Sequence, residues 1–125
     1  MISFDKLMES RMDWAEDGFR KYLNAVQYCV HDIAISKGWW NEDRCDGELI
    51  ALIHSELSEC LEALREGNGK SEKIPLFSKA EEEMADAVIR IMDHCEARKW
   101  DLSGAIIAKI GYNSKREYKH GGKLF

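Results

Sequence analysis

The chain has 125 residues, of which 45% are hydrophobic and 33% are charged, and its formal net charge is −5. This length fits one domain over residues 1–125, and the composition is sufficient for a buried core. The sequence has no run of about 18 apolar residues and no N-terminal basic region followed by an apolar stretch, so we expect a cytoplasmic protein with no membrane association. Its cysteines form no C-x-x-C pair, so we expect reduced thiols. The acidic balance also argues against a nucleic-acid partner.

Helical periodicity runs through the chain and predicts an all-α fold of four to five helices. The first helical region is expected over residues 4–37, with Gly18 as a candidate break and Gly38 as its end. Asp46 is the expected N-cap of the second helix, which should end at residues 67–69.

Two further helices follow the loop that contains the single proline. Ser78 and Glu81 form a capping box, which predicts a third helix that runs to about Lys99. Asp101 is the expected N-cap of the last helix, which we predict to extend to about Lys119.

Two acidic pairs of equal spacing lie on the second and third predicted helices. They are Glu56 with Glu59 and Glu83 with Asp86. Residues three apart share one side of a helix, so each pair presents two carboxylates together. If the helices pack side by side, the carboxylates converge, and oxygen clusters of this kind suit Mg2+.

A solvated face with ion pairs is the competing interpretation, and it is favoured for any single E-x-x-E on a helix. The apolar stripe of each helix, which we expect to face the core, does not include the acids. At about 100° per residue, Glu56 lies roughly 80° and Glu83 roughly 100° from the centre of its stripe. The stripes comprise Leu49, Ile53, Leu57, Cys60, Leu61 and Leu64 on the second helix, and Ala80, Met84, Ala87, Val88, Ile91 and Cys95 on the third.

The C-terminal stretch over residues 109–125 is basic in an otherwise acidic chain. It carries five lysines and arginines against the single acid Glu117, which gives it a charge of +4 and leaves −9 for the rest. Such a tail favours a phosphate-bearing substrate, with a metal bridging that substrate to the acids.

The order and separation of these features resemble the MazG-type all-α nucleoside triphosphate pyrophosphatases. Residues 52–65 are similar to the first metal helix of that family, residues 82–90 to the second, and residues 109–123 to its Lys…Asn…Arg-x-Tyr-x-His-Gly ending. The family often has proline after this arginine, whereas this chain has Glu117. The resemblance covers residues 22–125.

The resemblance implies a four- to five-helix bundle that cleaves a nucleoside triphosphate, or a deoxynucleoside triphosphate, to the monophosphate and pyrophosphate. The implied Mg2+ ligands, for which Mn2+ could substitute, are Glu56, Glu59, Glu83 and Asp86, with Glu56 or Glu59 as the base that accepts the proton of water. The implied phosphate-binding or tail-ordering residues are Lys109, Asn113, Arg116, Lys119 and Lys123. A homodimer or homotetramer is also implied.

Three residues outside both the acidic pairs and the tail are candidate substrate contacts. Trp39 and Trp40 follow a helix end and offer flat surfaces for a nucleobase, although both could instead be core or interface aromatics. His54 lies one turn from the acids and could bind substrate, but a structural role is the more common one for such a histidine.

Different functional classes remain open. A di-iron bundle needs two E-x-x-H motifs, and this chain has one, Glu117 to His120, which counts against iron. A non-catalytic helical interaction module is a further candidate, as are an all-α dUTPase and a phosphoribosyl-ATP pyrophosphohydrolase.

The apolar residues of the first helical region are more numerous than one short bundle needs, which fits their burial between subunits. They are Phe4, Leu7, Met8, Met12, Phe19, Leu23, Val26 and Val30.

Overall fold

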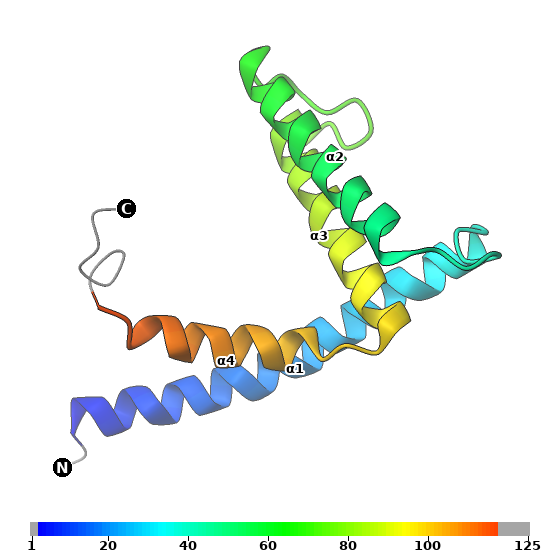
Figure 1. Ribbon diagram of the computed structural model, residues 1–125. Helices are drawn as coiled ribbons and strands as arrows, with labels where there is room; N and C mark the ends of the chain where they lie inside the picture. Colours follow the sequence, from blue (N-terminus) through cyan, green and yellow to red (C-terminus); the bar gives the residue numbers. More distant parts are fainter. Residues whose placement is uncertain (1–2, 118–125) are drawn as a thin grey trace. The chain divides into compact units, whose positions relative to one another are not determined.

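The computed structural model describes residues 3–117, and the side chains of residues 4, 5 and 7–14 lie outside that description. This range contains four α-helices and no β-strand: α1 (Phe4–Ser36), α2 (Asp46–Arg65), α3 (Lys79–Arg98) and α4 (Leu102–Ser114) (Figure 1). The expected all-α class is confirmed. None of the helices in the described range is long and apolar enough to cross a membrane.

The chain divides into two compact units, and α1 contributes to both. One unit comprises residues up to Val26 together with those from Asp101 onward. Within it, α1 and α4 are joined by Arg20 Nη1, which donates to Asp101 Oδ2 at 3.5 Å, and by a hydrogen bond of 2.9 Å from Ser103 Oγ to Asn24 Oδ1. Ser103 is fully buried, so this bond stabilises the contact between the two helices.

The other unit comprises Gln27–Trp100 and contains the antiparallel pair of α2 and α3. Small residues allow the two helices to approach closely, and Cys60 Sγ lies 3.6 Å from the Ala80 carbonyl oxygen. The buried apolar residues of this unit are Leu49, Cys60, Ala63, Ala87, Met92 and Cys95.

The α2–α3 contact lies to one side of the predicted apolar stripes, so the expected core face is partly wrong. Glu56 is buried, whereas Leu57, Leu61 and Leu64 on α2 are 43%, 50% and 55% exposed. Val88 on α3 is also half exposed. The buried members of the two stripes are Leu49, Cys60, Ala87 and Cys95, so mostly small residues of the stripes are buried together with Glu56, and most of the larger side chains stay at least partly exposed.

Two of the three predicted N-caps are present in the structure. Ser78 and Glu81 form the expected capping box, and the Asp101 side chain caps α4 as expected. The expectation for α2 was wrong, because Cys45 is its N-cap and accepts from the Glu48 amide through Sγ at 3.4 Å. Asp46 is instead the first helical residue, and its carboxylate binds distant side chains.

Two other boundary expectations also differ from the structure. Gly18 lies within α1 without breaking it. The last helix ends at Ser114 rather than near Lys119, and Lys115 is its C-cap. Gly111, Asn113 and Ser114 are poor helix formers, which accounts for the early end.

Candidate functional site

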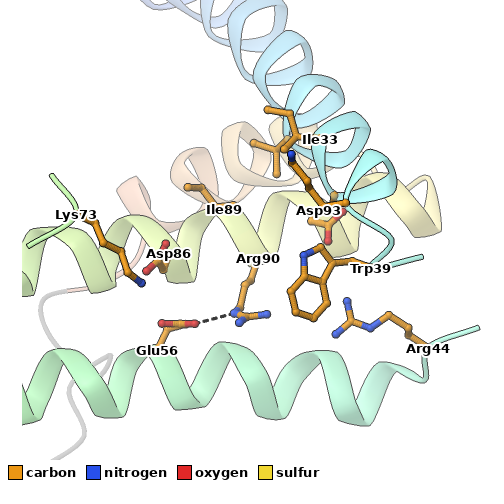
Figure 2. A pocket seen from close by; sticks show the side chains of 12 residues that line it. Ile33, Trp39, Arg44, Glu56, Lys73, Asp86, Ile89, Arg90 and Asp93 are labelled. Atoms are coloured by element: carbon orange, nitrogen blue, oxygen red, sulfur yellow. Dashed lines mark hydrogen bonds and ion pairs between the residues drawn. The ribbon is translucent and has the colours of Figure 1, made fainter. Parts of the chain in front are cut away.

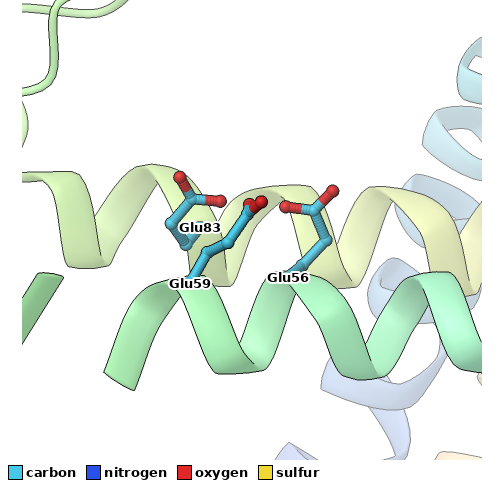
Figure 3. A group of neighbouring side chains, drawn as sticks. All are labelled: Glu56, Glu59 and Glu83. Carbon is cyan, nitrogen blue, oxygen red and sulfur yellow. The ribbon is translucent and has the colours of Figure 1, made fainter. Parts of the chain in front are cut away.

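Three of the predicted acidic residues converge where α2 and α3 face one another (Figure 3). Glu56 and Glu59 project from α2 and Glu83 from α3, and one carboxylate oxygen of each lies within 4.8 Å of the others. A second group within the same distance consists of Glu82, Glu83 and Asp86. The four predicted metal ligands are therefore brought into two adjacent groups that share Glu83.

Glu83 lies at the centre of this arrangement, and its environment disfavours the ionised form. Its Oε2 atom is buried and has no hydrogen-bond partner among the described residues. Burial, together with contacts to the carboxyls of Glu56 and Glu59, raises the pKa of Glu83 to about 7. A divalent cation would satisfy the orphan oxygen and remove the repulsion, so this set of oxygen donors fits such an ion.

The neighbouring acids differ from Glu83 in their electrostatic balance. Burial alone would raise the pKa of Glu56, but hydrogen bonds with Arg90, Glu83 and Glu59 bring the pKa below its usual value. Burial raises the pKa of Asp86, and the charges of Glu56 and Glu82 add to this effect. The cluster therefore combines carboxyls held ionised with others that retain protons more readily.

A pocket of about 360 Å³ adjoins the acidic cluster, and Glu56 and Asp86 form part of its wall (Figure 2). This volume lies within the range of sites that bind small molecules. The other lining residues combine four cations with an aromatic ring, aliphatic side chains and one further acid: Lys37, Arg44, Lys73 and Arg90, then Trp39, then Val30, Ile33, Ala34 and Ile89, and finally Asp93.

Two of the lining cations are paired with acids of the cluster. Arg90 Nε donates to Glu56 Oε1 at 2.9 Å. Lys73 Nζ lies 3.8 Å from Glu82 Oε1, and the loop that carries it is anchored by buried Ser71, whose Oγ donates to Glu82 Oε2 at 2.7 Å. These contacts place positive charge beside the carboxylates.

The two tryptophans of the loop after α1 occupy different environments. Trp39 is 59% exposed and lines the pocket, whereas Trp40 is half-buried and donates through Nε1 to Asp93 Oδ1 at 3.0 Å. His31 Nδ1 lies 2.7 Å from the same oxygen. The Arg44 guanidinium lies 5.8 and 5.4 Å from the two tryptophan ring centres. Trp39 is therefore the tryptophan available for stacking, and the Trp40 contact fixes the loop to α3.

The N-terminus of α2 is fixed to the end of α3 by a second polar contact. Asp46 Oδ1 accepts from Arg98 Nε at 2.7 Å and lies 2.8 Å from Nε2 of buried His94. Hydrogen bonding from Arg98 and then from His94 holds the pKa of Asp46 below its usual value. This clamp keeps the two helices that carry the acids in register.

The remaining predicted site residues lie elsewhere. His54 is exposed on α2 and does not line the pocket. Lys109 and Asn113 lie exposed on α4 and Arg116 follows it, so these three belong to the unit that does not contain the acids. Lys119 and Lys123 lie outside the described residues.

Most of the positive charge beside the acids was not among the site residues predicted from the sequence. Arg90 and Asp93 continue the strip of α3 that begins with Glu83 and Asp86, because they follow at intervals of four and three residues. That spacing was a usable signal. Lys73 offered none, because it lies in the loop between α2 and α3 and reaches the cluster only through tertiary contacts.

No protein-family model matches the chain, and no curated protein or solved structure shows significant similarity to it.

Proposed function

We propose that the chain is a MazG-like, Mg2+-dependent nucleoside triphosphate pyrophosphohydrolase that converts a (deoxy)nucleoside triphosphate and water to the monophosphate and pyrophosphate. The observation that carries the proposal is the convergence of Glu56, Glu59 and Glu83 from two helices beside a cation-lined pocket that contains an exposed tryptophan. Oxygen ligands for a divalent ion, positive charge for phosphates and a flat surface for a base are the three parts that such a substrate requires.

Each acid has a defined role in the proposed reaction. Glu56, Glu59, Glu83 and Asp86 would hold Mg2+, or Mn2+ in its place, and the bound ion would offset the charge of the triphosphate and lower the pKa of water. Glu56 or Glu59 accepts the proton as the water oxygen bonds to the α-phosphorus. The bond between the α-phosphorus and the oxygen that bridges to the β-phosphorus breaks, and pyrophosphate leaves with that oxygen.

The pocket accounts for binding of the rest of the substrate. Trp39 stacks on the base, while Lys37, Arg44 and Lys73 offset the charge of the phosphates. In the proposal, the tail residues Lys109, Asn113, Arg116, Lys119 and Lys123 add phosphate contacts, and the protein is a homodimer or homotetramer.

Product analysis tests the proposal directly. The protein is incubated with Mg2+ and each common NTP and dNTP, and the products are separated. Monophosphate plus pyrophosphate is expected, with turnover reduced about 100-fold or more in Glu59→Gln. Glu62→Gln, an exposed acid on the same helix, is the matched control and should retain activity.

Other products would contradict the proposal in informative ways. Diphosphate plus orthophosphate would place the cleavage at another bond. Turnover confined to dUTP or to phosphoribosyl-ATP would indicate one of the related hydrolases. No turnover, together with no Mg2+-dependent thermal shift in the presence of nucleotide, would favour a non-catalytic interaction module.

A further inference from the structure

Arg90 connects the acidic cluster to the pocket. It projects from α3 into the pocket wall, and in Figure 2 its guanidinium points towards Glu56. Nε donates to Glu56 Oε1 at 2.9 Å, and the two side chains are 35% and 11% exposed. Arg90 therefore acts as the counter-ion of a buried carboxylate that also belongs to the triad with Glu59 and Glu83.

This ion pair competes with metal binding. The Glu56 oxygen that accepts from Arg90 is one of only two oxygens that Glu56 could offer to an ion. A guanidinium at hydrogen-bond distance also places a positive charge next to the place where a divalent cation would bind, and the two cations repel. A cation that takes Glu56 as a ligand must therefore displace Arg90 from it.

The displaced guanidinium needs another anion, and the nearby carboxylates already have other partners. Asp93, one turn further along α3, already accepts from Trp40 and contacts His31. Asp86, one turn earlier, belongs to the second acid group that a cation would draw together. The pocket that Arg90 lines is where a polyphosphate would lie, and the planar fork of arginine suits phosphate oxygens.

We propose that Arg90 holds Glu56 while the metal site is empty and moves to a substrate phosphate when a divalent cation takes Glu56. This inference rests on the proposed function, because the second half of the exchange requires a phosphate-bearing substrate. It makes Arg90 a phosphate-binding residue that the sequence interpretation did not include.

The first half of the exchange is tested by metal binding alone. Mn2+ is titrated into wild type and Arg90→Gln without nucleotide, and free Mn2+ is measured by electron paramagnetic resonance. Removing the competing guanidinium should tighten Mn2+ binding about tenfold. Arg65→Gln is the matched control, since it removes the same charge and an exposed ion pair from α2, and it should leave the Mn2+ affinity unchanged.

The second half is tested with inorganic tripolyphosphate, which has phosphates but no base. Its binding to the Mn2+-loaded proteins is measured by isothermal titration calorimetry. Arg90→Gln should bind tripolyphosphate at least about tenfold more weakly, and Arg65→Gln should match wild type. If Arg90→Gln does not fold, Arg90→Lys, which keeps the charge without the fork, should show the same two changes at smaller size.

Opposite changes in the two affinities would support the exchange. Unchanged or weaker Mn2+ binding in a folded Arg90 variant would overturn it, as would unchanged tripolyphosphate binding. Failure of the proposed function is recognised separately, because nucleotide turnover with the predicted products could be absent while both affinities still change as expected. Turnover could equally be present without these changes, and the inference about Arg90 would then fail alone.

Discussion

Replacing Glu83 by glutamine should stabilise the metal-free protein above neutral pH. In the folded chain, burial and the adjacent Glu56 and Glu59 carboxyls raise the pKa of Glu83 from 4.5 to about 7. The folded state therefore keeps a proton that the unfolded state loses as pH rises from 4.5 to about 7, so the free energy of unfolding falls over this window. A shift of this size corresponds to roughly 3 kcal/mol once Glu83 is ionised.

Thermal unfolding in a chelator at about pH 5.5 and about pH 8 measures this effect. At the higher pH, Glu83→Gln should unfold roughly 5–10 °C above wild type, and at the lower pH, where Glu83 keeps its proton in the folded state, the gain should be less than half as large. Mg2+ should then raise the Tm of wild type but not of the variant, because the variant lacks the ligand. Glu62→Gln should behave like wild type, since its ion pair with Arg65 is exposed.

Two results would refute the reasoning about Glu83. An equal gain at both pH values would show that the variant acts through packing rather than through loss of an ionised carboxylate. No gain at about pH 8 would show that the repulsion within the triad is already relieved in the metal-free protein.

Three further predictions concern the base, a cap and the exposed stripe. Trp39→Leu should weaken nucleotide binding about tenfold in calorimetry but leave tripolyphosphate binding unchanged, because only the base stacks on the ring; equal weakening of both would contradict this role. Ser78→Ala should lower the free energy of unfolding, measured in urea, by about 1 kcal/mol through loss of the capping box. Ser58→Ala, at an exposed position within α2, should change it little, and equal losses in the two variants would refute the role of Ser78 as a cap. Leu61→Glu should shift a homo-oligomer to monomer in sedimentation velocity, because Leu61 is 50% exposed in the single chain, and a monomeric wild type would contradict the proposed assembly.

The helices could be predicted from sequence because their signals are local. The capping box at Ser78 needs only residues within one turn, and the structure contains it as expected. The equal spacing within each acidic pair also predicted which carboxylates share a helix face. In the structure α2 and α3 pack side by side, so these faces are neighbours and Glu56, Glu59 and Glu83 meet.

The expectations that were wrong depended on partners distant in the chain. Asp46 is a better intrinsic cap than Cys45, but Arg98 binds its carboxylate at 2.7 Å, and this tertiary contact occupies it. Glu56 lay about 80° from the centre of the predicted apolar stripe, and an acid is seldom buried without a partner, so its burial was not expected. Its burial depends on Arg90, which lies 34 residues further along the chain, so helix periodicity alone could not predict it.

The pairing of charges in the described chain suggests why the proposed substrate and its metal should bind together. Glu56 is paired with Arg90 and Glu82 with Lys73, so acids and cations of the same site neutralise one another. A divalent ion that binds alone is coordinated by the acids but leaves two cations beside it without partners. A polyphosphate that binds alone pairs with the cations but leaves the carboxylates unpaired. Binding both exchanges each pair for a stronger one, with carboxylate to metal and cation to phosphate. We therefore expect positive cooperativity between Mg2+ and triphosphate, of equal size whichever ligand is added first, because the coupling free energy is reciprocal.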